Sequence, residues 1–270
     1  MTAGQFLETP LHQWHVDNGG RMVEFAGWSM PVQYASIVAE HHHTRKKLGL
    51  FDVSHMGRLF FSGSDVDQFL DSLSTRRIVG VAPGKVRYSL ICNDDGKILD
   101  DVLIYHLAAG EGFPAGDDSG NSFYMMVCNA SNRAKIVKWF SDHVPADSNI
   151  KIDDRTETTA MIAVQGPEAN AVVAKLASSD PETLAYYCGT VCKVDGGDAI
   201  VSRTGYTGED GCAAVCIKLK ATWPVSRPWA RSFSADRPLR ETLDPAPHFA
   251  VARTLFRARN ATLAPMDRRT

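Results

Sequence analysis

Two adjacent aspartates interrupt an apolar segment of the chain. Asp100 and Asp101 lie in the segment 85–105, KVRYSLICNDDGKILDDVLIY, where two apolar runs flank an Asn-Asp-Asp-Gly turn at 93–96. This pattern predicts a β-hairpin with both aspartates on its second strand. Neighbouring strand residues face opposite sides, so at least one carboxylate is expected to point to the interior. Burying a carboxylate is costly unless it is paired, so such an acid is either a satisfied structural group or a working one.

A second group of acids lies in a glycine-rich loop, TGYTGEDGC at 204–212. Glycines let the backbone approach a ligand closely. The spacing matches neither the dinucleotide fingerprint nor the phosphate-binding loop, and Glu209 and Asp210 place acid where a phosphate would need base. A carboxylate on such a loop suits a ligand edge that is rich in hydrogen-bond donors.

Other chemistries have weaker signals. Ser54 and His55 are adjacent in sequence, but a catalytic triad is a matter of spatial geometry and no G-x-S-x-G elbow is present. Four of the six cysteines form two C-x3-C pairs without nearby histidines, which is not a zinc spacing, so we predict small buried thiols and no metal. The run 41–43 of three histidines would fan around a helix and predicts a solvated face.

The composition is that of an ordinary globular protein. The chain has 270 residues, 44% hydrophobic and 22% charged, enough for about two domains. A net charge of −2 carries no electrostatic footprint for nucleic acid. No apolar run reaches the length needed to span a membrane, and the first fifteen residues hold no Lys or Arg, so no targeting signal is visible.

Periodicity predicts an α+β fold. One helix is expected at 33–48, with Ile37, Val38 and Leu48 facing inward. Further helices are expected at 64–73, 129–144 and 167–177, and strands at 59–61, 122–128, 158–164, 186–187, 191–194 and 199–203. We divide the chain into an α+β domain at 1–149 with the hairpin, a second at 150–220 with the glycine loop, and a tail at 221–270.

The tail has a different composition. Residues 221–270 hold nine arginines, no lysine, no glycine and six of the thirteen prolines. That composition argues against a packed terminal domain. Our hypothesis is that the tail is truncated, aberrant or poorly ordered.

Several segments resemble one family. GRMVEFAGWSMPVQY, EHHHTRKKLGLFDVSHMG, GKVRYSLICNDDGKILDDVLIY, MIAVQGPEA and RTGYTGEDG, in this order and spacing, resemble the T-proteins of the glycine cleavage system, which are tetrahydrofolate-dependent aminomethyltransferases. The similarity covers about residues 9–211. Five linked motifs are far more specific than any one of them.

The resemblance implies a cloverleaf of three domains around a folate pocket, of which this chain covers the first two, with the third largely absent. It implies that Asp100, the first aspartate of the ILDD run, is the catalytic acid that supports folate N5 as a nucleophile, and that Asp101 is a structural or solvent-facing neighbour. The implied folate contacts are Met56, Tyr88, Asn129, Tyr187, Glu209 and, from an Arg-Glu-Thr-Leu echo in the tail, Arg240.

The resemblance also implies partners. The co-substrate is tetrahydrofolate, and the one-carbon unit arrives on the lipoyl arm of the H-protein of the glycine cleavage system. Such proteins work in the mitochondrial matrix of eukaryotes or the cytoplasm of bacteria. Two alternatives stay open: a related folate-dependent demethylase or one-carbon oxidase module, and a non-catalytic folate-binding protein.

Overall fold

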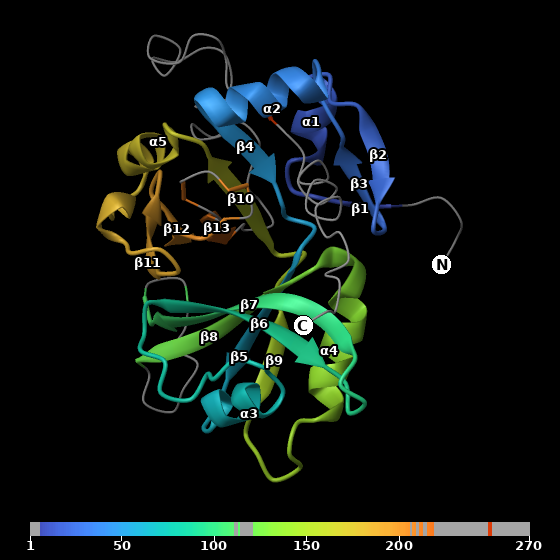
Figure 1. Ribbon diagram of the computed structural model, residues 1–270, viewed down its shortest axis with the longest axis vertical. Helices are drawn as coiled ribbons and strands as arrows, with labels where there is room; N and C mark the ends of the chain where they lie inside the picture. The colour runs from blue at the N-terminus through green and yellow to red at the C-terminus, as the bar shows by residue number, and fades with distance from the viewer. Residues whose placement is uncertain are drawn as a thin grey trace, which may run out of the picture.

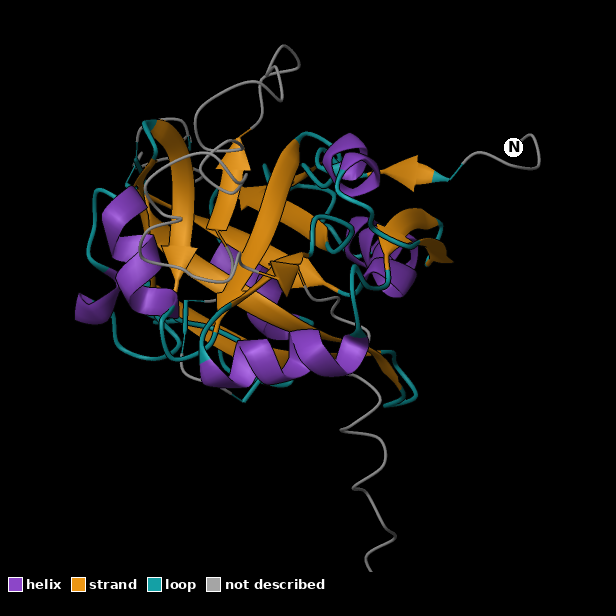
Figure 2. Ribbon diagram, turned by 90° about the horizontal axis from the view of Figure 1, so that it is seen from above, coloured by secondary structure: helices purple, strands orange, loops and turns teal. Residues whose placement is uncertain are grey.

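The computed structural model describes residues 6–110, 113, 121–205, 207–208, 211–212, 215–218 and 248–249. Their strands form three sheets, and helices lie around them (Figures 1 and 2). The α+β class predicted from the sequence is therefore confirmed. The tail lies outside the described residues except for strand β14 (His248–Phe249), which pairs with β4 in parallel.

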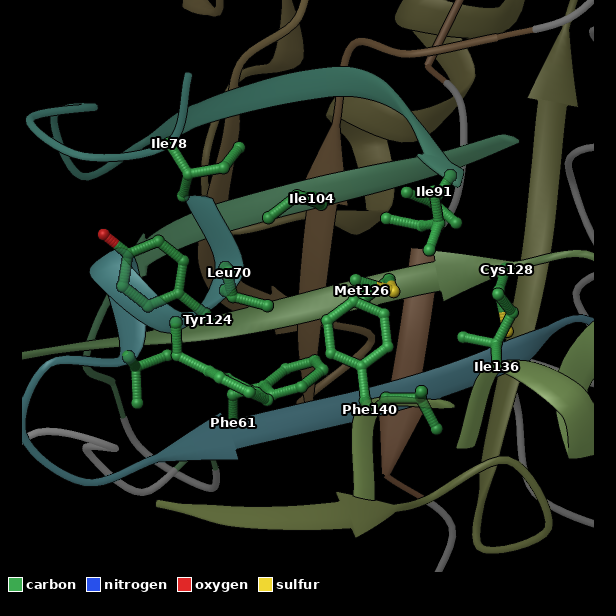
Figure 3. Packing of buried hydrophobic residues seen from close by; sticks show 14 of the residues in the cluster. Phe61, Leu70, Ile78, Ile91, Ile104, Tyr124, Met126, Cys128, Ile136 and Phe140 are labelled. Atoms are coloured by element: carbon green, nitrogen blue, oxygen red, sulfur yellow. The ribbon is translucent and has the colours of Figure 1, made fainter. Parts of the chain in front are cut away.

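A five-stranded sheet has the order β6-β7-β8-β5-β9. Its strands are β5 (Gly57–Ser62), β6 (Lys85–Cys92), β7 (Ile98–Ala108), β8 (Ser122–Cys128) and β9 (Lys151–Asp154). Helices α3 (Val66–Ser72) and α4 (Arg133–Asp142), the latter preceded by a 3-10 turn η1 (Ala130–Asn132), cover its outer face. Alternate strand residues such as Phe61, Ile104 and Met126 pack there against Leu70 and Phe140 (Figure 3).

A six-stranded sheet has the order β11-β12-β13-β10-β4-β14. Its strands are β4 (Gly49–Asp52), β10 (Thr159–Gln165), β11 (Gly189–Val194), β12 (Gly197–Ser202), β13 (Val215–Lys218) and β14. Helix α5 (Ala169–Leu176) and the 3-10 turn η2 (Pro181–Thr183) follow β10. A second core joins this sheet to the inner face of the five-stranded sheet, and it includes Phe51, Met161 and Ile200 from one side and Leu103 and Tyr105 from the other.

A small N-terminal sheet, β1-β3-β2, holds β1 (Leu7–Glu8), β2 (Met22–Phe25) and β3 (Trp28–Pro31), with α1 (His12–Asp17) between β1 and β2. Helix α2 (Ile37–Lys46) then leads into β4. Sheet membership crosses the predicted domain boundary at 149/150, because β9 belongs to the five-stranded sheet and β4 to the six-stranded one. The division into domains stays a prediction.

The predicted inward face of α2 is partly wrong. Leu48 is buried, but Ile37 is 39% and Val38 64% exposed, and the buried α2 residues are Glu40 and Thr44. The carboxylate of Glu40 accepts hydrogen bonds from the backbone N–H groups of Tyr34 and Ala35, at 2.8 and 3.1 Å. These bonds turn the polar side of the helix inward, and a prediction from apolar periodicity does not take such bonds into account.

Candidate functional site

The hairpin β6–β7 carries the site. Its turn forms as the sequence predicts: Gly96 adopts a left-handed φ of 75°, and the Asn93 side chain accepts from Lys97 N at 2.8 Å. A β-bulge follows, since Ile91 pairs with Asp100 and Cys92 with Ile98. Leu99 is the extra residue. Bulges re-aim neighbouring side chains, and this one lies immediately before the two aspartates.

Asp100 faces the helix-covered side of the sheet. It is 3% exposed, and its carboxylate accepts from Asn129 N at 2.9 Å, Asn129 Nδ2 at 2.9 Å and Asn132 Nδ2 at 2.5 Å. The buried Cys128 lies nearby, and burial together with the charge of Asp100 raises the pKa of its thiol to about 12. Asp100 is thus a paired carboxylate that ties β7 to the start of η1 and α4.

Asp101 lies on the opposite, inner side of the sheet. Its carboxylate accepts from Tyr88 Oη at 3.3 Å and from Asn129 Nδ2 at 2.9 Å. Leu103 and Tyr105, at the same alternation on β7, belong to the core between the two sheets. Asp101 is only partly buried. Asp101 is therefore the aspartate of the pair that lies on the side of the core between the two sheets.

Three other predicted contacts border the same inter-sheet core. Met56, Tyr88 and Tyr187 are partly buried and pack against it. Tyr187 is not in a strand, contrary to the prediction for 186–187, because its φ of 57° is left-handed. Its carbonyl accepts from Val86 N at 2.9 Å, which fixes it beside β6. The structure thus gathers Met56, Tyr88, Asp101 and Tyr187 around one face.

Met56 is held in place by a buried arginine that sequence analysis missed. Arg58 has no exposed surface, and its guanidinium donates to the carbonyls of Met56 at 2.5 Å and Ser54 at 3.0 Å. It also donates to Thr159 Oγ1 at 2.6 Å and to the carbonyl of Thr156. A guanidinium with five fixed donors can order two loops at once. Its place in an apolar strand, RLFF, was the signal available in the sequence.

A buried polar network lies beside this loop. Asp52 accepts from Thr9 Oγ1 at 2.7 Å and Ser54 N at 2.9 Å, and its Oδ2 lies 2.9 Å from His15 Nε2. Burial alone would raise the pKa of Asp52, but the bonds and charge of His15, with the bonds from Ser54 and Thr9, lower it to about 2. Ser54 bonds to Met161, so Ser54 and His55 form no nucleophile–base pair.

His55 is a buried side chain near the site with an unpaired ring nitrogen among the described residues. It is 4% exposed, its Nδ1 has no hydrogen-bond partner among the described residues, and its ring meets the edge of Phe25. Burial lowers its pKa to about 4, with the charge of Arg58 adding to the effect and that of Asp52 opposing it. His55 is therefore neutral at physiological pH.

The glycine loop is described in part. Thr207 Oγ1 donates to Gln165 Oε1 at 2.7 Å, and Gln165 Nε2 donates to the carbonyl of Cys212 at 2.9 Å. A Cβ on Gly205 would lie 2.4 Å from Gln165 Oε1, so the close approach needs glycine there. Two predicted contacts, Glu209 and Arg240, lie outside the described residues.

The described residues offer no group of three or more His, Cys, Asp or Glu side chains that could hold a metal ion. The described cysteines, Cys92, Cys128, Cys188, Cys192 and Cys212, are free thiols. No helix in the described part of the chain is long and apolar enough to cross a membrane.

Comparison with known proteins identifies the family. The family described as the GCVT N-terminal domain matches residues 11–218. The chain belongs to this family. Similar curated proteins include the aminomethyltransferases of Herpetosiphon aurantiacus, 43% identical over 204 residues, and of Rubrobacter xylanophilus, 44% identical over 208 residues. These alignments cover 76% and 77% of this chain but 53% and 52% of the relatives.

A solved structure agrees with this assignment. The glycine cleavage system aminomethyltransferase T from Bartonella henselae superposes with a TM-score of 0.68 at 29% identity, over 79% of this chain and 54% of that one. The family resemblance found in the sequence is confirmed. The chain spans about half the length of the curated relatives it matches. Those relatives are bacterial proteins, and they give no support to a mitochondrial location.

Proposed function

We propose that this chain is the folate-binding part of an aminomethyltransferase. It would receive the aminomethyl group carried on the lipoyl arm of an H-protein and transfer its methylene to tetrahydrofolate, with release of ammonia. The observation that carries this proposal is Asp101, a partly buried carboxylate held by Tyr88 and Asn129 on the face that Met56 and Tyr187 border.

This face has the chemistry that a pterin ring requires. Met56, Tyr88 and Tyr187 supply apolar and aromatic surface, against which a flat bicyclic ring packs well. A fixed carboxylate at short range in a low-dielectric site stabilises positive charge that develops on a ring nitrogen. Asp101 can do this because Tyr88 and Asn129 hold its carboxylate in place.

Asp100 takes a supporting role in this proposal. Its hydrogen bonds all come from Asn129 and Asn132, so it orients Asn129, whose side-chain amide also donates to Asp101. Glu209, as the acceptor for the pterin N–H and amine, and Arg240 stay predictions from the family resemblance. We also infer that the chain corresponds to the first two domains of a three-domain cloverleaf.

The decisive experiment compares the two aspartates. Anaerobic calorimetric titration with tetrahydrofolate is measured for the unaltered chain, Asp101→Asn and Asp100→Asn. Turnover is measured for the same three proteins as ammonia released from tetrahydrofolate and a carrier whose lipoyl arm bears the aminomethyl group. We expect Asp101→Asn to lower turnover about a hundredfold or more and to leave the thermal midpoint nearly unchanged. Asp100→Asn should destabilise the fold by about 1–3 kcal/mol, because its new amide would face the donors of Asn129 and Asn132.

A matched control is Asp95→Asn, an exposed aspartate in the same hairpin turn. If Asp100→Asn instead abolishes turnover at unchanged stability and Asp101→Asn does not, the assignment of the two roles is wrong. Glu209→Ala tests the loop contact: unaltered affinity for tetrahydrofolate would remove Glu209 from the pocket.

The alternative to this proposal is a non-catalytic protein, in which the face lined by Met56, Tyr88 and Tyr187 binds folate without turnover. Saturable tetrahydrofolate binding with no turnover would establish that non-catalytic alternative. Methylene transfer from an N-methyl amine substrate that is oxidised by an added two-electron acceptor, with no need for the lipoylated carrier, would instead establish a demethylase or oxidase module.

A further inference from the structure

A lysine and a cysteine meet where the two large sheets join. Lys85, the first residue of β6, donates from Nζ to Cys188 Sγ at 3.3 Å. Cys188 immediately precedes β11, and the two residues form an isolated antiparallel bridge between the sheets. They are 103 positions apart in sequence. Neither residue has a part in the proposed folate site.

The backbone fixes this contact on both sides. Gly189 N donates to the carbonyl of Gly84 at 2.9 Å, and Val86 N donates to that of Tyr187 at 2.9 Å. The carbonyl of Cys188 itself accepts from Arg203 N at 2.8 Å. The thiol is 8% exposed, whereas Lys85 lies at the surface. Two reactive groups held this close react as if at high effective concentration.

We propose that Lys85 and Cys188 form a reversible covalent cross-link under peroxide, in which one oxygen atom bridges the lysine nitrogen and the cysteine sulfur. Hydrogen peroxide first oxidises the thiol to a sulfenic acid and leaves as water. A second peroxide takes one hydrogen from the sulfenic acid and one from the neutral amine and forms two waters. The nitrogen–oxygen bond forms with loss of those two hydrogens, so the link consumes two peroxides in all and releases three waters.

A dithiol reductant would reopen the bridge in two two-electron steps, each of which oxidises one dithiol to a disulfide. These steps return the free amine and the free thiol, and the bridging oxygen leaves as water. The link would close a loop across 103 positions, and a covalent closure of that size restricts the unfolded chain. The oxidised protein should therefore unfold at a higher temperature than the reduced one. The peroxide-treated protein would gain a covalent cross-link between its two large sheets, next to Tyr187.

The test is mass spectrometry of proteolytic digests of the folded chain after hydrogen peroxide. We expect a linked pair of peptides whose mass is their sum plus one oxygen less two hydrogens, lost on dithiothreitol treatment and absent from Lys85→Arg and Cys188→Ser. Cys192→Ser, which removes a half-buried thiol on β11, is the matched control and should keep the link. The proposal is overturned by oxidised Cys188 with an unmodified Lys85 peptide, by a linked pair without the added oxygen, or by a link that persists in Lys85→Arg.

Discussion

At the scale of single residues, two adjacent aspartates differ in their hydrogen-bond partners and in the side of the sheet that they face. Asp100 has its carboxylate occupied by three hydrogen bonds from Asn129 and Asn132, on the side that the helices cover. Asp101 shares one of those donors but faces the core between the sheets, where Tyr88 and Met56 lie. The comparison of Asp101→Asn with Asp100→Asn therefore separates chemistry from stability within one dipeptide.

His55 makes a prediction about pH at the same scale. Its folded-state pKa of about 4 lies below the unfolded value of 6.5, so the unfolded chain binds the extra proton. The contribution of neutral His55 to the free energy of unfolding is fully present above pH 6.5. It declines as the pH falls toward 4, by on the order of 3 kcal/mol. Asp52 follows in a lower window, since its stabilising contribution is lost as the pH falls from 3.8 toward about 2.

Urea unfolding at pH 7, 5.5 and 4.5 (roughly the upper and middle part of this titration) measures the effect. His55→Gln should reduce the loss of stability at low pH. His41 is an exposed histidine of α2, and His41→Gln should leave that loss unchanged. An equal decline in His55→Gln and the unaltered chain would show that another group causes it.

At the scale of elements, α2 is oriented by a carboxylate rather than by its apolar side chains. Glu40 is 2% exposed and accepts two backbone N–H groups, while Val38 is 64% exposed. We expect Glu40→Ala to destabilise the fold by about 1–3 kcal/mol, because it leaves buried donors unpaired. Val38→Ala should stay within about 0.5 kcal/mol. Chemical denaturation of both variants measures these losses of stability. A larger loss of stability in Val38→Ala than in Glu40→Ala would support the apolar inward face that the sequence predicted.

At the scale of the whole molecule, the described part of the chain crosses twice between the two large sheets. Strand β4 of the six-stranded sheet leads into β5 of the five-stranded sheet, and β9 of the five-stranded sheet leads back into β10 of the six-stranded sheet. Within the sheets, β4 pairs with β10 and β5 pairs with β9. One core joins both sheets, with Leu103 on one side and Ile200 on the other. We expect a single cooperative unfolding transition. Leu103→Ala and Ile200→Ala should each lower the free energy of unfolding by about 2–5 kcal/mol.

Intrinsic tryptophan fluorescence and far-ultraviolet circular dichroism, followed together against urea, measure this cooperativity. Coincident curves in both variants are the expected result. Separate transitions, with only one of them moved by Ile200→Ala, would mean that the two sheets fold independently.

The sequence by itself determined the local structure and the family. The Asn-Asp-Asp-Gly turn predicts the hairpin, a short apolar run predicts β8, and the linked motifs identify the relatives, because turn chemistry, apolar patterning and motif order are properties of neighbouring residues. The family resemblance implied Met56, Tyr88 and Tyr187 as contacts, and the structure gathers these three residues on one face.

Only the tertiary structure decided what each side of the strands faces. The five-stranded sheet is covered by helices on one face and by the other sheet on its second face, so both Asp100 and Asp101 point inward and alternation alone cannot choose between them. The choice depends on Asn129, Asn132 and Tyr88, which reach the two carboxylates from other parts of the chain. The buried Arg58 and the inward Glu40 are likewise explained by their hydrogen-bond partners. Thr156 and Thr159 are distant from Arg58 in sequence, and Tyr34 and Ala35 lie before α2 and outside its helical period. Polar burial is decided by the hydrogen bonds that satisfy it.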